Sequence, residues 1–395
     1  MARRSHQETI LETLPASHTP GKVEKRNDQK SILLIGNFLS EGGGRANENF
    51  EVAKARRFKA LGWTVYTASD EINRLHRLVE MVTAVWRERK NYSVAHVSLF
   101  SGPAFVWAAV ACFLLKLLGK SYVVTLHGGD LPRFARRWPW PVRKLLRGAK
   151  AVTTPSNYLS VAMKPFRDDV DIIPNSLDIK SYPYDVREKP RPQLIWLRAF
   201  HTIYNPVLAP HVLARLVRDF PDIQMLMIGP DMGDGSFNDT KQLACSLGVD
   251  RMISFPGRVP KRDVPLWLSK GDIFLNTANI DNTPVSVLEA MACGLCVVST
   301  NVGGMSALVD HERDGLLVPA EDPNAMADAV RRVLIEPALA KRLSSAARKK
   351  VEQFDWEQTL PRWQKVLFHY WISCYTSLSE MMGVELGSLT QFMEI

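Results

Sequence analysis

The sequence contains few cysteines, five in 395 residues, which is too few for the disulfide framework that stabilises many secreted proteins. We therefore expect a protein that folds in a reducing, cytoplasmic compartment. Glycine and proline together make up about 12% of the residues, which excludes collagen-like and low-complexity proteins. With 46% hydrophobic and 23% charged residues, the composition is that of a folded globular protein, and the length predicts two or three domains.

Long apolar runs are also absent. The best candidate for a membrane span is Ala104–Leu118, which has 15 residues and includes Lys116, whereas a spanning helix needs about 20. This run suits a buried helix better. Residues 1–30 are polar and lack the apolar core of a secretory signal, so we expect a disordered tail there.

The motifs of several large enzyme classes are missing as well. No G-x-G-x-x-G follows the first predicted strand, and G-x-x-x-x-G-K-[ST], H-E-x-x-H and G-x-S-x-G do not occur. Cys293 and Cys296 have redox or zinc spacing, but nothing nearby completes a metal site, so two small buried side chains are the favoured interpretation. Asp169 and Asp171 could pair on a metal, yet we favour a polar stretch that leads into a strand. The sequence thus predicts no metal and no cofactor.

Apolar runs that alternate with helical patterns predict two parallel α/β domains. We predict an N-terminal domain over 31–180, a charged, proline-containing linker over 181–192, a C-terminal domain over 193–355, and a helix and tail over 356–395. Ligands of such domains bind at the carboxyl ends of the strands. The predicted strands are Ser31–Phe38, Trp63–Ala68, Ser93–Leu99, Tyr122–Leu126, Ala151–Pro155 and Val170–Pro174 in the first domain, and Gln193–Leu197, Gln224–Ile228, Met252–Phe255, Ile273–Asn276, Val297–Thr300 and Leu316–Val318 in the second.

Positive charge is concentrated in the first half of the chain. Residues 1–190 hold thirty Lys and Arg against eighteen Asp and Glu, whereas residues 191–395 hold twenty against twenty-three. The segment Leu131–Lys150 has seven cations, no acid and two tryptophans. Cations mixed with tryptophan favour an anionic membrane surface, and an ordinary solvated face is the alternative. No nucleic-acid-binding motif occurs, so we expect no nucleic acid partner.

Two carboxylates give the strongest chemical signal. Asp281 and Glu289 are eight residues apart, and Asn282-Thr283-Pro284 between them predicts a helix start, with a polar N-cap candidate ahead of a proline. Both carboxylates can face one ligand that lies across the helix N-terminus, where unpaired N–H groups and the helix dipole suit a diphosphate. This pattern fits a nucleotide-sugar. The alternative is a helix-capping acid and a solvated glutamate.

This stretch resembles the E-x7-E region of the family 4 (group 1) glycosyltransferases, which are retaining enzymes with the two-domain GT-B fold. The resemblance covers roughly residues 31–375. It implies two Rossmann-like, doubly wound parallel sheets that face each other across a cleft, with a C-terminal helix that returns to the N-terminal domain. It also implies that Glu289 binds the donor ribose and that Asp281 lies by the transferred sugar. The residues between them that it assigns to the donor are Asn282, Thr283, Pro284, Val285 and Ser286.

Other segments match the family in the expected order. The strand that ends at Leu126 is followed by His127, which matches the active-site histidine of the family, and a purely structural histidine is the alternative. Arg198 is implied to stabilise the leaving diphosphate. Gly229 ends a strand, and Val259 lies in the turn whose backbone reads the base. A glycine-rich loop is implied to approach acceptor or phosphate oxygens, and it consists of Gly42, Gly43, Gly44 and Arg45.

Ser176 replaces a glycine of the family before the linker, and three further positions depart from the family pattern. Asp281 is one methylene shorter than the usual glutamate, and Cys296 replaces a proline. Tyr204 stands six residues after Arg198, where the family usually has a lysine. This last departure removes one of two cations expected at the leaving diphosphate.

The resemblance predicts a retaining, metal-independent glycosyltransferase. We expect it to move a sugar from a nucleotide-sugar to a lipid-linked glycan acceptor, in polysaccharide or glycolipid biosynthesis, as a peripheral protein on the inner leaflet of the cytoplasmic membrane. His127 would position the sugar or support its positive charge. Two alternatives stay open. The first is a catalytically weak protein of the same fold that binds a nucleotide-sugar or a membrane partner, and the second is a hydrolase or epimerase that acts on a nucleotide-sugar.

Overall fold

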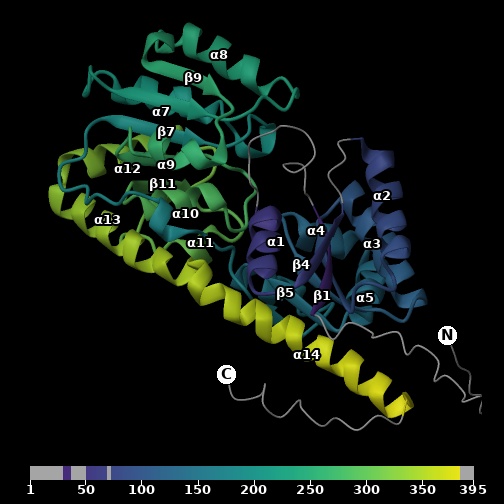
Figure 1. Cartoon of the computed structure of the whole chain (residues 1–395). Coiled ribbons are helices and arrows are strands. Elements are labelled where there is room, and N and C mark those ends of the chain that lie inside the picture. The colour runs from purple at the N-terminus through teal and green to yellow at the C-terminus, as the bar shows by residue number, and fades with distance from the viewer. Residues whose placement is uncertain (1–29, 37–49, 69–72, 383–395) are drawn as a thin grey trace, which may run out of the picture.

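The computed structural model describes residues 30–36, 50–68 and 73–382, and its strands form two separate sheets of six parallel strands (Figure 1). The strand orders are β2-β1-β3-β4-β5-β6 and β12-β11-β10-β7-β8-β9. In each sheet the order reverses beside the first strand, which is the mark of a doubly wound fold. The expected GT-B architecture is confirmed. The tail predicted at 1–30 and the loop that contains Gly42 to Arg45 lie outside the described residues.

The strands of the second sheet match the prediction best, and four of them have the predicted bounds. Buried parallel strands are continuous apolar runs between polar turns, which makes their ends easy to read. The bounds of the first sheet are β1 (Ser31–Ile35), β2 (Thr64–Ala68), β3 (Val94–Leu99), β4 (Ser121–Leu126), β5 (Ala151–Thr154) and β6 (Val170–Ile172). Those of the second are β7 (Gln193–Leu197), β8 (Gln224–Ile228), β9 (Ile253–Gly257), β10 (Ile273–Asn276), β11 (Cys296–Thr300) and β12 (Leu316–Val318).

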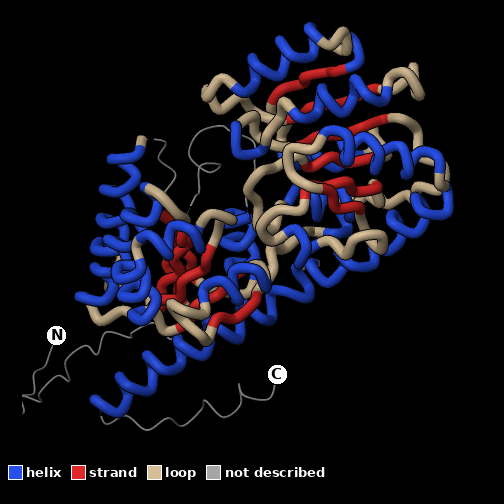
Figure 2. The backbone as a smooth tube through the Cα atoms, turned by 180° about the vertical axis from the view of Figure 1, so that it is seen from behind, coloured by secondary structure: helices blue, strands red, loops and turns tan. Residues whose placement is uncertain are grey.

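Helices cover both faces of each sheet (Figure 2). One face of the first sheet packs against α2 (Arg74–Arg87), α3 (Pro103–Leu117), α4 (Leu131–Arg137), α5 (Pro139–Gly148) and α6 (Asn157–Met163). The other face packs against α1 (Phe50–Ala60) and α14 (Trp356–Met382). One face of the second sheet packs against α7 (Leu208–Leu216), α8 (Ser236–Ser246) and α12 (Pro323–Ile335). The other face packs against α9 (Val264–Leu268), α10 (Val285–Ala292) and α11 (Met305–Leu308). Helix α13 (Pro337–Val351) contributes buried residues to the apolar cores on both faces.

The C-terminal helix α14 belongs to the first sheet although it follows the second in sequence. Trp356, Trp363 and Leu367 are buried against Ile32 and other residues of the first sheet. Figure 1 shows α14, in yellow, running from the second domain beneath the first. The return of the last helix, which the resemblance implied, therefore occurs.

Helix α3 is only half buried, so the expectation of a buried helix over Ala104–Leu118 was partly wrong. Phe105 and Leu115 lie in the core, but Val106, Phe113 and Leu117 are 54%, 60% and 67% exposed. A run that is apolar on all sides gives no periodicity from which a solvent-facing side can be read. Within the described part of the chain, no helix is long and apolar enough to span a membrane.

A charged pair is buried between α1 and α14. Lys54 Nζ lies 2.9 Å from Glu51 Oε2 and 4.6 Å from the ring centre of Trp363 on α14. Burial raises the pKa of Glu51, but Lys54, together with His96 and His127, lowers it by more and holds that pKa at about 2. Burial, and then Lys54, hold the pKa of the neighbouring His96 well below its usual value. The Glu51 carboxylate therefore stays ionised beside a neutral imidazole, beneath the first sheet.

Candidate functional site

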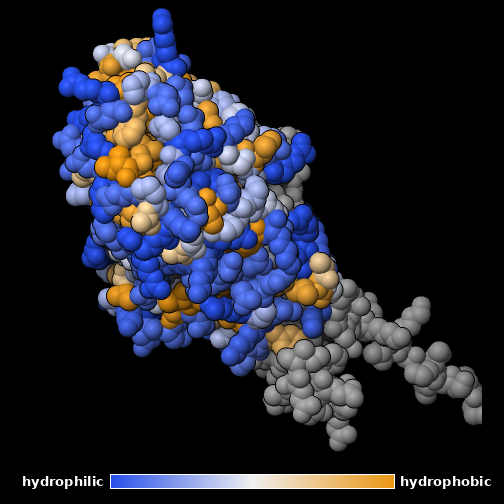
Figure 3. All heavy atoms as spheres, turned by 90° about the vertical axis from the view of Figure 1, so that its left-hand side faces the viewer, coloured by the Kyte–Doolittle hydropathy of each residue, from blue (hydrophilic) through white to orange (hydrophobic). Residues whose placement is uncertain are grey.

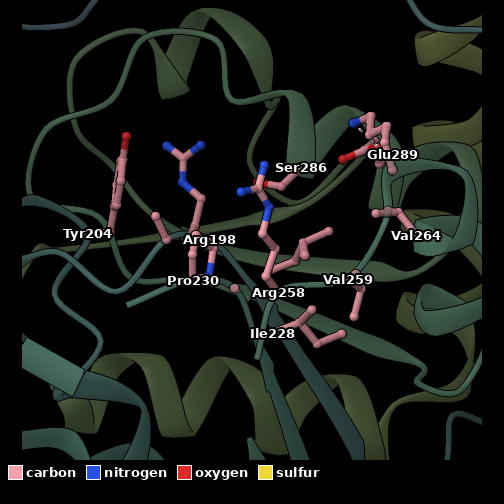
Figure 4. Close-up of a pocket in the computed structure, with 13 residues that line it drawn as sticks. Arg198, Tyr204, Ile228, Pro230, Arg258, Val259, Val264, Ser286 and Glu289 are labelled. Carbon is pink, nitrogen blue, oxygen red and sulfur yellow. Dashed lines mark hydrogen bonds and ion pairs between the residues drawn. The ribbon is translucent and has the colours of Figure 1, made fainter. Parts of the chain in front are cut away.

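A cavity of about 250 Å³ opens at the carboxyl ends of β7 and β8, beside the point where the strand order of the second sheet reverses. The loop after β9 and the first turn of α10 complete its walls (Figure 4). The five predicted site residues that line it are Arg198, Gly229, Val259, Ser286 and Glu289.

Gly229 allows two strand ends to meet at this cavity. Its φ is +154°, and a Cβ built on it would lie 1.6 Å from the carbonyl oxygen of Arg198. No larger residue fits between these backbones, because a real Cβ never approaches an oxygen so closely. The glycine therefore fixes the end of β8 against the residue that carries the cavity's arginine.

The first turn of α10 faces the cavity without a side-chain cap. Pro284 occupies the N-cap position and makes no side-chain hydrogen bond to the turn, so the expectation of a polar N-cap among residues 282–284 was wrong. Val285 is the first helical residue, and the buried Oγ of Ser286 has no hydrogen-bond partner in the described chain. Unpaired N–H groups and a free hydroxyl at a helix N-terminus form a site for an anion.

Glu289 is buried and held by two neighbours, which excludes the solvated glutamate considered above. The hydroxyl of Tyr182 donates to its Oε1 over 2.6 Å, and Lys261 Nζ lies 2.5 Å from the same oxygen. Only 2% of Glu289 is exposed. Burial, and then the Glu289 carboxylate, raise the pKa of Tyr182 far above its usual value, so the phenol stays a donor. One oxygen is thus committed to protein partners, and the carboxylate remains an acceptor for hydroxyl groups.

Asp281 is joined to the cavity through Arg198. The guanidinium of Arg198 donates to the Asp281 carboxylate, and both side chains are mostly buried. Arg198 also lies over the ring of Tyr204, 4.1 Å from its centre. The departure at position 204 therefore places an aromatic ring against the arginine instead of a second cation.

His127 follows β4 in the other domain, where the sequence placed it. Its ring stacks on Phe100 with 4.9 Å between the centres, and its covered Nε2 has no hydrogen-bond partner in the described chain. Burial lowers the pKa of His127 to about 4, against an opposing effect of Glu51. The imidazole is therefore neutral at pH 7 and can position a hydroxyl group, but it does not bring a positive charge.

The two domains are in contact just before the N-terminus of α10. Ser156 donates a hydrogen bond to the side-chain oxygen of Asn282, and Asn175 donates to the carbonyl of Thr283 over 3.1 Å. Gly129, two residues after His127, is so close to the Asp281 backbone that a Cβ would lie 2.6 Å from its carbonyl oxygen. Asp281, Asn282 and Thr283 are thus at the interface beside the cavity, within reach of both domains.

Comparisons with known proteins agree with this arrangement. The family of group 1 glycosyl transferases matches residues 185–350, and glycosyltransferase family 4 matches residues 38–181. The D-inositol 3-phosphate glycosyltransferase of Saccharomonospora viridis is 33% identical over 171 residues, which are 41% of this chain and 40% of that protein. The enzyme of the same name from Pseudarthrobacter chlorophenolicus is 24% identical over 307 residues, 72% of this chain and 73% of its own length.

This chain belongs to the family 4, group 1 glycosyltransferases. The family is named for the transfer of sugars. Among solved structures, the sucrose-phosphate synthase of Thermosynechococcus elongatus superposes with a TM-score of 0.74 at 17% identity, over 87% of this chain and all of that one. Anabaena HepE, in complex with UDP and glucose, gives 0.64 at 16% identity, over 90% of this chain and all of that one. These two structures share the fold with this glycosyltransferase.

The weaker candidates of the sequence have ordinary structural roles in the glycosyltransferase. Burial raises the pKa of both the Cys293 and the Cys296 thiol to about 12, so they stay protonated. Asp169 pairs with Arg167, whose Nη2 donates to its carboxylate over 2.8 Å. Among the residues that the structure describes, no group of three metal-ligating side chains comes together.

Sequence reasoning missed three side chains of the site, namely Tyr182, Arg258 and Lys261. Arg258 and Lys261 flank Val259 in the loop after β9, so two cations near the base-reading turn were a usable signal. Tyr182 comes from the segment between the domains, and no local pattern connects it with Glu289. The glycine-rich loop, Gly42 to Arg45, lies outside the described residues.

Proposed function

We propose that this glycosyltransferase acts with retention of configuration and without a metal, and that its acceptor is a lipid-linked glycan in polysaccharide or glycolipid biosynthesis. The observation that carries the proposal is the cavity, which combines an uncapped helix start, cationic side chains and a buried carboxylate. A nucleotide-sugar needs these groups for its diphosphate and its ribose hydroxyls.

In this mechanism the donor diphosphate lies across the first turn of α10. The C1–O bond to the diphosphate breaks, and its electron pair goes to the phosphate oxygen, where Arg198 and the N–H groups near Ser286 stabilise the charge. The acceptor oxygen forms the new bond to C1 on the same face, and its proton passes to the leaving phosphate. Glu289 accepts from the ribose hydroxyls. Neutral His127 positions the sugar, and the protein supplies the positive charge that a metal would otherwise bring.

A surface of the first domain supports a membrane-associated acceptor. All seven cations of Leu131–Lys150 are exposed, and none has an acidic partner in the described chain. Trp138 and Trp140 on the same segment are 51% and 69% exposed. Helix α3 packs between α2 and α5, and its exposed apolar residues extend this face. Figure 3 shows a different side of the molecule, which is mostly hydrophilic with apolar residues in small groups. The first domain thus offers cations and apolar side chains together, as binding to an anionic leaflet requires.

A soluble anionic acceptor is the second candidate, because the curated relatives are named for transfer to D-inositol 3-phosphate. Such an acceptor would use the same donor cavity. Transfer of a radiolabelled sugar to extracted membrane lipid, compared with transfer to D-inositol 3-phosphate, separates the two acceptors.

Donor binding is tested with the variant Glu289→Gln, which keeps the shape of the side chain but removes its charge. We expect one of the UDP-, GDP-, dTDP- or ADP-linked sugars to raise the melting temperature of the wild type, because a ligand at 100 times its dissociation constant adds about 2.7 kcal/mol to the free energy of unfolding. The shift should vanish in Glu289→Gln and persist in Glu352→Gln, whose side chain is 59% exposed outside the cavity. If no donor shifts the wild type, the scaffold alternative replaces the enzyme.

Membrane binding is tested by flotation with vesicles that contain about 30% anionic lipid, since the proposed surface is cationic. Each basic residue near such a surface contributes about 1 kcal/mol, so neutralising Arg136, Arg137, Arg143 and Lys144 to glutamine should weaken binding roughly a hundredfold or more. The double variant Lys241→Gln/Lys270→Gln, in the other domain, is the control and should bind like the wild type. A wild type that stays unbound at low salt contradicts the membrane role.

A further inference from the structure

Three cations line the donor cavity, and two of them are already paired. Arg198 is held by Asp281, and Lys261 by Glu289. Arg258 is exposed and has no acidic partner in the part of the chain that the structure describes. Figure 4 shows the guanidinium groups of Arg198 and Arg258 pointing to the same side of the cavity, with Ser286 beside that of Arg258. The free positive charge of the cavity is therefore on the loop after β9.

A diphosphate carries more negative charge than one paired arginine can balance. Arg198 shares its charge with Asp281, and its neighbour Tyr204 offers a ring face and a neutral phenol. The ring attracts the guanidinium, which restricts where the guanidinium can point. Tyr204 thus orients Arg198 but contributes no charge of its own, so a second cation is needed beside Arg198.

We propose that Arg258 supplies the second positive charge on the donor diphosphate and that Tyr204 is a positioning residue for Arg198. The assignment rests on the proposed function of the cavity. A guanidinium suits the task because two of its N–H groups can bind two phosphate oxygens at once. The loop after β9 carries Val259 toward the base, and Arg258 next to it reaches toward Ser286 and the start of α10. Arg198 and Arg258 then hold the diphosphate from two sides.

The test measures binding to the full-length chain by calorimetry. The probe is whichever of UDP, GDP, dTDP and ADP the wild type binds most tightly, together with its monophosphate. Arg258→Ala should weaken binding of the diphosphate by about 10- to 100-fold, the usual effect of a lost hydrogen bond to a charged group. Binding of the monophosphate should change much less. Arg262→Ala, on the same loop with a side chain 82% exposed, is the matched control and should bind both like the wild type.

Variants of Tyr204 separate the effect of a lost positive charge from the effect of a lost aromatic ring. Tyr204→Lys in the Arg258→Ala background should recover most of the lost diphosphate affinity, because it returns a cation to the cavity wall. Tyr204→Phe keeps the ring and should lower kcat less than Tyr204→Leu, which should lower kcat with little change in melting temperature.

Two results overturn the assignment while leaving the donor site intact. The first is an Arg258→Ala variant that binds the diphosphate like the wild type, and the second is an equal loss for diphosphate and monophosphate, which would place Arg258 on the nucleoside. A wild type that binds none of the diphosphates overturns the proposed function itself, and the role of Arg258 with it.

Discussion

Replacing Arg198 by glutamine should lower kcat by about 10²- to 10³-fold, the usual cost of removing a preorganised group that stabilises charge developing in the transition state. Arg198 lies at the cavity between Asp281 and Tyr204, so its position is fixed before the donor arrives. Preorganised charge of this kind acts mainly on the transition state, so KM for the donor should change less than kcat. Steady-state kinetics with the donor identified by thermal shift measure both quantities.

Two controls sharpen this result. Arg198→Lys keeps the charge but loses the bidentate hydrogen bonding of the guanidinium. Its kcat should therefore lie between those of the wild type and Arg198→Gln. Arg215→Gln alters an exposed arginine on α7 and should leave kcat unchanged. A kcat of Arg198→Gln within threefold of the wild type would contradict a role for this residue at the leaving group.

The largest effect on stability is expected for Lys54→Met, which we predict to lower the free energy of unfolding by about 3–5 kcal/mol. The substitution keeps much of the side-chain volume but leaves the carboxylate of Glu51 buried without its lysine. It also removes the cation from the face of Trp363. Urea denaturation followed by tryptophan fluorescence measures the change.

The double variant Lys54→Met/Glu51→Gln distinguishes loss of the pair from loss of packing. Since it neutralises the carboxylate that has lost its lysine, it should recover most of the stability that Lys54→Met loses. Lys59→Met, at an exposed position of the same helix, should change stability by less than about 0.5 kcal/mol. An unaltered denaturation midpoint for Lys54→Met would show that the Glu51–Lys54 pair makes no net contribution to the free energy of unfolding.

The sequence was most informative where local pattern and tertiary structure have the same cause. A strand that is buried on both faces must be apolar throughout, so the bounds of β7, β8, β10 and β12 could be read directly. Gly229 and Glu289 were identified through a resemblance, and the structure supplies their physical reasons, which are a close backbone approach and a buried carboxylate.

Pairings between distant segments could not be predicted in this way. Nothing in the local sequence connects Tyr182 or Lys261 with Glu289, because their separations are 107 and 28 residues. From local sequence alone, Lys54 and Glu51 would be predicted to be solvated helix residues, because the helix that covers them, α14, is distant in the sequence. The prediction of a polar N-cap was wrong for a local reason, since a proline with φ −66° can begin a helix without any polar side chain.

The position of α14 sets an order of events during synthesis. The first domain is translated by about residue 180, but Trp356, Trp363 and Leu367, which complete its core, follow roughly 190 residues later. At about 5–20 residues per second, the ribosome needs on the order of 10–40 s to produce them. Throughout this interval the nascent first domain lacks the helix that covers one face of its sheet and the Glu51–Lys54 pair. The first domain therefore finishes folding last, although it is made first, and a chaperone has its longest opportunity to bind there.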